Sequence, residues 1–211
     1  DCTFLVDLAE GKKLLPDPPI ASIGYQASIV ITPQQEADID IKATLNNLLI
    51  PYTSNYAGTL LPGIREYTVT PGEKTTTISG KGKAGLKQEE NYYFFYLPVC
   101  YKGITGKSYA YYNTSRSKNL YLPASVDENY SYDIQLPENL TLCTPIQEKK
   151  IDNPIGSFKI TLTSEGSSLH IELALQIKKQ LITPAEYPAF RSLITEWTDR
   201  TRKPILFKTV Q

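Results

Sequence analysis

The chain has 211 residues, and its 22 lysines and arginines balance 22 aspartates and glutamates, so the formal net charge is zero. This balance argues against a nucleic-acid-binding protein, which usually carries an excess of basic side chains, and no apolar run approaches the length of a membrane span. Hydrophobic residues make up 41% of the chain, enough for the core of one large or two small domains, and the 15 tyrosines and 15 prolines favour strands and turns.

Alternating apolar and polar residues predict a pair of strands near the N-terminus. Residues 22–31 and 37–45 both follow the period-2 pattern of half-buried antiparallel strands, in which every second side chain faces the core. Residues 32–36 contain proline and polar side chains and predict a turn, so the two runs form a hairpin or meander. Residues 46–62 mix apolar pairs with turn-forming residues and predict a loop with strand fragments.

The strand pattern continues through most of the remaining chain. Turn-forming residues separate the strands, as at Pro71-Gly72 and over the run from Ser164 to Ser167, which predicts a hairpin turn. In chain order, the expected strands cover residues 65–70, 74–79, 90–100, 108–113, 126–136, 157–163 and 169–178.

One substantial helix is predicted between about residues 184 and 202. Thr183 can serve as the N-cap, Pro184 takes the first helical position and Glu186 follows three residues after the cap, which is a capping box. Pro188 comes too late for the first turn, so it should divide a short opening turn from the helix proper. The large apolar side chains share one face at helical spacing, and we expect Phe190 and Trp197 to be buried against the sheet. These side chains are Tyr187, Phe190, Leu193, Ile194 and Trp197.

Together these elements predict a mainly β fold with antiparallel, sandwich-like sheets and one C-terminal helix packed on them. A short apolar strand, residues 205–207, should follow the helix. A soft boundary near residue 88 divides an N-terminal β region, residues 1–88, from a C-terminal β domain, residues 89–211. One continuous sandwich is the alternative.

Residue types that carry catalysis or bind metals are sparse in this sequence. His170 is the only histidine, and its alternation with apolar neighbours places it on the polar face of a strand. The cysteines Cys2, Cys100 and Cys143 match no zinc pattern, so we expect buried, small apolar residues, with a Cys100–Cys143 disulfide as the alternative. The sequence therefore predicts no catalytic residue, no metal site and no cofactor.

Two other motifs are expected to be structural. Gly80, Gly82 and Gly85 spell the G-x-G-x-x-G pattern of nucleotide-binding loops, but a strand-like run follows them where such a loop requires a helix. We interpret these glycines as a flexible hairpin loop. The adjacent acids Asp127 and Glu128 are expected in a solvated turn, because neighbouring carboxylates usually diverge.

Clustered tyrosines are the best candidate for a binding surface. Two aromatic runs could present a broad face that combines apolar area with hydroxyl groups, as sugar-binding and protein-binding surfaces do. Packing in the core or between domains is the alternative, because half of each strand must face a core. The candidate residues are Tyr92, Tyr93, Tyr96, Tyr109, Tyr111 and Tyr112.

A series of short motifs follows one another from Ser117 to the C-terminus. They are LYLP from Leu120, YDIQLP from Tyr132, NPIGSF from Asn153, LHIELALQIKKQLI from Leu169, TPAEY from Thr183 and PILFK from Pro204. In this order they resemble the C-terminal β domain of unknown function of bacterial transglutaminase-like proteins, which have a papain-like core. The catalytic Cys, His and Asp motifs of that core have no counterpart here, so no catalytic residue can be transferred.

The resemblance implies a non-catalytic accessory module, for structure or protein interaction, in an exported protein at a periplasmic or cell-surface location. The chain contains no methionine, which predicts a processed form or a fragment. The expected partner is an upstream catalytic-type domain of the same protein or another protein. The alternative function is a carbohydrate- or peptide-binding β-sandwich that uses the Tyr-rich face. Nucleic acid and a membrane span are not expected.

Overall fold

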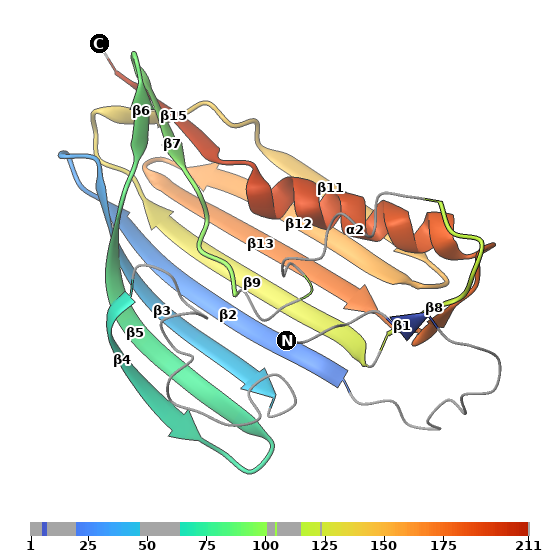
Figure 1. Ribbon diagram of the computed structural model, residues 1–211. Coiled ribbons are helices and arrows are strands. Elements are labelled where there is room, and N and C mark those ends of the chain that lie inside the picture. The colour runs from blue at the N-terminus through green and yellow to red at the C-terminus, as the bar shows by residue number, and fades with distance from the viewer. Residues whose placement is uncertain are drawn as a thin grey trace.

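The computed structural model consists mainly of β-strands, with one helix near the C-terminus (Figure 1). The predicted strand over residues 108–113, and all of the predicted loop 46–62 except its first residue, lie outside the described part. The described residues are 6–7, 20–46, 64–100, 104, 115–122 and 124–210.

A long, twisted eight-stranded sheet forms the body of the protein (Figure 1). The strand order is β11-β12-β13-β9-β2-β3-β5-β4, and every neighbouring pair is antiparallel except β2 and β9, which run parallel. The strands are β2 (Ile20–Ile31), β3 (Glu36–Asn46), β4 (Ile64–Pro71), β5 (Thr75–Gly85), β9 (Ser125–Gln135), β11 (Gln147–Asn153), β12 (Gly156–Glu165) and β13 (Ser168–Ile177). The predicted mainly β fold and the predicted hairpin of β2 and β3 are therefore confirmed.

The two faces of this sheet differ sharply in chemistry. Period-2 alternation turns Ile, Leu, Val and Tyr side chains of the central strands to one face, which we call the inner face, where they are buried. The opposite face, which we call the open face, carries Ser, Thr, Asn, Gln and charged side chains. In β13, for example, Leu169 to Ile177 alternate between the buried core and an intermediate or exposed position. This is the usual arrangement of an antiparallel sheet with one solvated side.

Helix α2 (Tyr187–Arg202) covers part of the inner face over β12 and β13 (Figure 1). An opening turn precedes the helix, as predicted, and in it the N–H of Tyr187 bonds the carbonyl of Thr183 at 2.9 Å. The helix begins at Tyr187, so Pro184 lies in the opening turn and Pro188 in the first helical turn, where a proline is tolerated. The predicted positions of these two prolines in the helix were therefore wrong. The capping box forms only in part. Glu186 Oε2 accepts hydrogen bonds from the N–H and the hydroxyl of Thr183, both at 3.0 Å, but Thr183 is not the N-cap of the helix.

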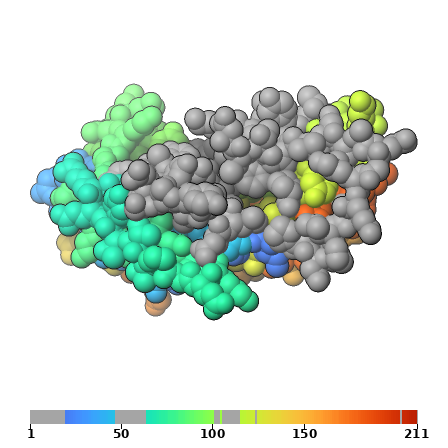
Figure 2. All heavy atoms as spheres, turned by 60° about the horizontal axis from the view of Figure 1, so that its bottom comes forward, coloured from blue at the N-terminus to red at the C-terminus, as the bar shows by residue number. Residues whose placement is uncertain are grey.

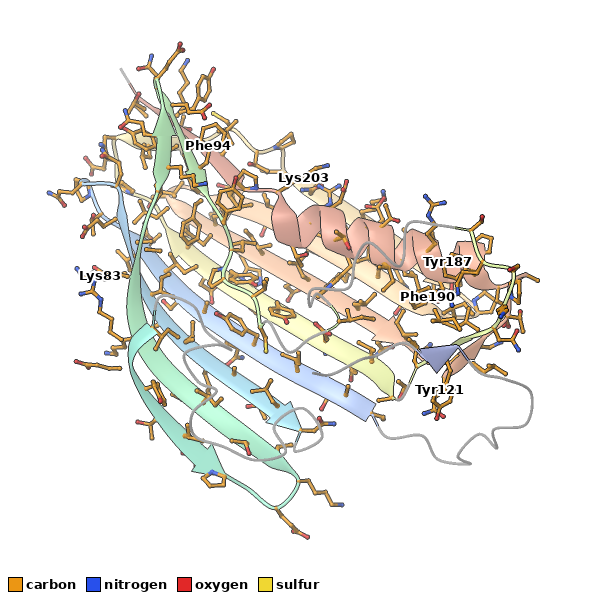
Figure 3. The ribbon with its side chains drawn as sticks, in the orientation of Figure 1. Lys83, Phe94, Tyr121, Tyr187, Phe190 and Lys203 are labelled. Carbon is orange, nitrogen blue, oxygen red and sulfur yellow. The ribbon has the colours of Figure 1, made fainter. Side chains whose placement is uncertain are left out.

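The apolar stripe of α2 is buried, as predicted. Phe190, Leu193 and Trp197 have no measurable exposure, and Figure 3 shows Tyr187 and Phe190 together at the start of the helix. The Trp197 ring lies 5.6 Å from the Tyr130 ring on β9 and 6.4 Å from the Phe158 ring on β12, the second edge-on. Aromatic pairs at these distances add to the stabilisation from burial alone. The helix is therefore anchored to the middle of the sheet.

Two small sheets lie beside the helix and continue the inner layer. One has the order β10-β15-β7-β6, from Leu140–Leu142, Ile205–Thr209, Tyr92–Phe95 and Lys87–Glu89. The other has the order β1-β8-β14, from Val6–Asp7, Leu120–Tyr121 and Leu181–Ile182. The predicted apolar strand after the helix is β15, and its inward residue Phe207 is fully buried.

The glycine-rich motif does not form a loop, so that prediction was wrong. Gly80, Gly82 and Gly85 all belong to β5, which pairs with β3 along eleven positions from Asn46↔Thr75 to Glu36↔Gly85. An added Cβ at Gly80 would lie 2.8 Å from the carbonyl oxygen of Glu66 on β4. Glycine is needed at this position because the backbone of β4 approaches too closely for a side chain.

The large sheet crosses the predicted boundary near residue 88. The parallel ladder between β2 and β9 pairs Ile20 to Val30 with Ser125 to Gln135, and it joins strands from both sides of that boundary. The division into residues 1–88 and 89–211 stays a prediction about folding units, since the two halves share one sheet.

Candidate functional site

The described tyrosines of the predicted binding surface are divided between the core and the surface. In β7 and just after it, side chains alternate: Tyr93 and Phe95 are buried, whereas Tyr92 is 38% exposed and Tyr96 is 49% exposed. Phe94 lies between them on the outward side and is partly exposed. Core packing therefore accounts for one side of the strand, and the other side stays exposed, where a binding surface remains a prediction. Tyr109, Tyr111 and Tyr112 lie outside the described residues.

We call Tyr92, Phe94 and Tyr96 the aromatic strip. Lysines from the two neighbouring strands stand over its rings: Lys208 Nζ lies 6.0 Å from the Tyr92 centroid and Lys87 Nζ lies 5.4 Å from the Tyr96 centroid. These are cation–π distances. The strip combines apolar area with phenolic hydroxyls, and tyrosine and phenylalanine are enriched in protein–protein contacts.

The aromatic strip lies on a part of the molecule that projects. Figure 1 shows β6 and β7 extending beyond the end of the large sheet, and Figure 3 labels Phe94 there. In the space-filling view of Figure 2, the green residues of this hairpin form a raised group beside the teal residues of β4 and β5. A partner could reach this surface without displacing the described core.

A shallow groove crosses the middle of the open face. It has a volume of about 520 Å³ and spans five adjacent strands, from β3 through β2, β9 and β13 to β12. Small or polar side chains line most of it: Gly24, Gln26, Lys42, Thr44, Asn129, Ser131, Lys159, Glu172 and Ala174. Tyr25, Tyr130 and Leu173 border it from β2, β9 and β13, with their side chains in the core on the other side of the sheet. No local sequence pattern indicates this groove, because its residues come together only through the sheet register.

His170 lies on the polar face of β13, as predicted, and belongs to a network of charges. Its Nδ1 is 2.7 Å from Asp133 Oδ1 and its Nε2 is 3.5 Å from Glu172 Oε1, while Lys159 pairs with Glu172 at 3.2 Å. The hydrogen bond with Asp133 has the largest effect and raises the pKa of His170; burial opposes it, and the hydrogen bond with Glu172 adds a further, smaller increase. Both ring nitrogens are therefore engaged by carboxylates.

The two described cysteines, Cys100 and Cys143, are placed away from this histidine, and Cys2 lies outside the described residues. Cys100 is buried and interacts with the tyrosines of the inner face, so the sheet lies between its thiol and His170. Cys143 is half-buried after β10, and it forms no disulfide with Cys100. The disulfide alternative was wrong. Neither of the two described cysteines places a thiol beside the imidazole, as cysteine-based nucleophilic catalysis would require.

Glu128 is a buried carboxyl that the sequence placed wrongly in a solvated turn. It lies in β9 on the inner face with 2% exposure, because the strand register turns it inward beside Tyr130. Its oxygens accept a hydrogen bond from the Ile104 N–H at 2.5 Å and one from the Tyr130 hydroxyl at 3.2 Å. Burial, and to a smaller extent Asp127, raise the pKa of Glu128 to about 7 despite these two hydrogen bonds.

Tyr130, which donates to this carboxyl, packs with two other buried tyrosines. The ring of Tyr25 lies 5.2 Å from that of Tyr130 and 5.9 Å from that of Tyr132, and the Tyr132 hydroxyl donates to the carbonyl of Pro98 at 2.8 Å. Glu128 and Tyr132 thus hold Ile104 and Pro98 against the sheet. We interpret this cluster as part of the core rather than as a reactive site, since its polar groups hold backbone in place.

Within the described ranges, the structure contains no group of three or more His, Cys, Asp or Glu side chains placed to hold a metal ion. A search of the same residues for a helix both long and apolar enough to cross a bilayer found none.

Comparison with known proteins gives one family and one informative structure. The family described as "Domain of Unknown Function with solved-structure structure (DUF3858)" matches residues 91–207. This agrees with the resemblance to a β domain of unknown function. No curated protein matches the chain.

One matching solved structure is a crystal structure from Parabacteroides distasonis ATCC 8503, named a "putative protease". It shares 31% sequence identity with a TM-score of 0.50 over 58% of this chain. The match covers 24% of the Parabacteroides protein, so the chain spans about a quarter of that protein's length.

Proposed function

The chain belongs to the DUF3858 family, and we propose that it is a non-catalytic accessory module that docks on the catalytic domain of a larger, exported transglutaminase-like protein. The family match and the fold support a β domain of unknown function. The catalytic parent, the docking role and the periplasmic or cell-surface location are parts of the proposal.

The size of the matched region supports a modular role. The match joins 58% of this chain to 24% of a longer protein that carries a protease name, so the Parabacteroides protein contains the related fold as one part among others. We infer that this chain likewise functions beside another domain. The short motifs from Leu120 onward, which resemble the C-terminal region of transglutaminase-like proteins, point to the same kind of neighbour.

The non-catalytic assignment is supported by where the reactive side chains lie. His170 is held by Asp133 and Glu172 on the open face, whereas the Cys100 thiol is buried on the inner face. We therefore expect the purified chain to show no turnover of peptide, amide or glutamine-donor substrates. Activity that disappears in His170→Ala or Cys100→Ala would contradict the assignment.

The observation that carries the docking proposal is the aromatic strip. Tyr92 and Tyr96 stay exposed although the inward half of the same strand is fully used by the core. These two tyrosines lie on a projecting hairpin, each with a lysine over its ring. In an interface they could bury their apolar ring surface against a partner while their hydroxyls stay hydrogen-bonded.

A binding titration against the separately produced upstream region tests this surface. The double variant Tyr92→Ser/Tyr96→Ser should weaken binding by about tenfold or more, since exposed aromatic side chains at interfaces often carry over 1 kcal/mol each. Tyr67→Ser is the matched control, because Tyr67 is 44% exposed on edge strand β4 of the large sheet, outside the aromatic strip. Equal loss in both variants, or no loss in the double variant, would remove the aromatic strip from the proposal.

A further inference from the structure

The groove on the open face has a feature that folding does not explain, a glycine in the middle of a strand. Gly24 lies in β2, and an added Cβ would meet only the Thr44 carbonyl oxygen at 3.9 Å, an ordinary contact distance. Gly80 in β5 differs, because a Cβ there would lie 2.8 Å from backbone oxygen. Glycine within a strand weakens it and often marks a place where another molecule approaches closely.

The strand register shows how the groove is built. One row across the sheet runs Thr44, Gly24, Asn129, Ala174 and Lys159, and the next row runs Lys42, Gln26, Ser131 and Glu172. At about 4.8 Å between strands, the four steps of the first row extend over roughly 19 Å. The missing side chain of Gly24 and the short one of Ala174 keep the floor low in the middle, while lysines stand at both ends.

The polar groups in the groove are available for a ligand. Lys159 pairs with Glu172, but Gln26, Ser131 and Lys42 make no hydrogen bond or ion pair with other described residues. Asn129 uses its amide N–H toward Asp127 at 3.0 Å. The groove thus offers an amide, a hydroxyl and an ammonium group over a floor that does not obstruct a flat ligand.

These features do not fit the common ways of binding a peptide. The groove crosses the strands on a sheet face, so a peptide could not add to a strand edge, and the side chains of Tyr25 and Tyr130 are turned away from it. No apolar anchor pocket is present among the groove residues. A polyhydroxylated chain, in contrast, can donate and accept hydrogen bonds along a row of amide and hydroxyl groups, and Lys42 provides a cation for a carboxylate.

We propose that the groove over Gly24 binds a short acidic oligosaccharide, one that carries carboxylate groups on its sugar units. The site lies on the face opposite to α2 and the aromatic strip, so it is independent of docking to a neighbouring domain. Lys42 would pair with a carboxylate, and Gln26, Asn129 and Ser131 would bond the sugar hydroxyls.

The test is calorimetric titration of the whole chain with a uronic-acid oligosaccharide, a neutral oligosaccharide of equal length and an acidic peptide. The wild-type chain should bind the uronic-acid oligosaccharide most tightly. Gly24→Val should weaken this binding by about tenfold or more, because its branched side chain fills the floor, while the unfolding midpoint stays equal or rises since the position has room and valine favours strands. Lys42→Ala should reduce the preference for the acidic over the neutral oligosaccharide.

Two control variants separate an effect on ligand binding from an effect on stability. Ser28→Val places the same side chain on the same strand and face but outside the groove, so it should bind as the wild type does. Gly80→Ala should lower the unfolding midpoint, as expected for a glycine that packing requires. The proposal is overturned if no oligosaccharide binds, if the peptide binds better, if Gly24→Val binds normally, or if Gly24→Val unfolds as readily as Gly80→Ala.

Discussion

Replacing Trp197 with alanine should lower the free energy of unfolding by about 3–5 kcal/mol. Trp197 is fully buried, and its ring contacts those of Tyr130 and Phe158 at the centre of the inner face, so its removal leaves a large cavity between helix and sheet. Chemical denaturation followed by circular dichroism measures this loss. Thr195→Ala, on the exposed side of α2, should change stability by only about 0.5 kcal/mol or less.

The outcome decides whether α2 stabilises the sheet. The helix shields part of the inner face of β12 and β13 from solvent, since Phe158 of β12 and Trp197 of α2 are both completely buried where they meet. An unfolding curve for Trp197→Ala that matches the Thr195→Ala curve would show that the helix is not docked as described.

The stability of the chain should fall as the pH rises from about 4.5 to 7, because of Glu128. Its pKa is raised from 4.5 to about 7 in the folded chain, mainly by burial, so in this range the folded state keeps a proton that the unfolded state has released. The stabilising contribution is complete below the unfolded pKa and is lost as the pH passes the folded pKa. At about 1.4 kcal/mol per pH unit, the loss amounts to roughly 3 kcal/mol.

Comparison with Glu128→Gln isolates this contribution. The amide has the same shape and can still accept a hydrogen bond from the Ile104 N–H, but it does not titrate, so the difference in unfolding free energy between the two proteins should change across this pH window. Glu66→Gln, an exposed position on edge strand β4, serves as the control and should follow the wild-type curve. A constant difference between Glu128→Gln and wild type from pH 4 to 8 would contradict a buried, protonated carboxyl.

The spacing of apolar residues was sufficient to predict those strands and the helix in which one repeat, of 2 or of 3.6 residues, holds along the whole element. The alternation in β13 and in the β2–β3 hairpin predicted which side chains are buried, and the helical spacing from Tyr187 to Trp197 predicted the docked face of α2. In each case the information lies within one segment, because one face of the element must exclude water.

Features that depend on distant segments could not be predicted in this way. The charged run QEKKIDN gave no strand signal, yet it forms edge strand β11, which is tied to α2 by Lys149–Glu196 and by Asn153 to the Ala189 carbonyl. The parallel pairing of β2 with β9 arises where the antiparallel strands β11-β12-β13-β9 meet the antiparallel strands β2-β3-β5-β4. The sequence pattern of neither strand indicates this pairing. Glu128 was misplaced because the inward register of β9 outweighs the preference of a carboxyl for water.

The candidate surfaces show the same division. Alternation within β7 was enough to predict that some tyrosines would face the core and others the solvent, as Tyr93 and Tyr92 do. The groove over Gly24 needed the complete register of five strands, since it joins residues 24–44 with residues 129–174 and pairs Gly24 with Asn129.

Side-chain footprinting by hydroxyl radicals, applied to the intact parent protein and to this chain alone, tests the docking role most directly. If the module docks through the aromatic strip, Tyr92 and Tyr96 should lose reactivity in the parent protein, while Tyr67, similarly exposed on the edge strand β4, should keep it. Equal reactivity of Tyr92 and Tyr96 in both samples would contradict the proposed accessory module that packs on its catalytic neighbour through this surface.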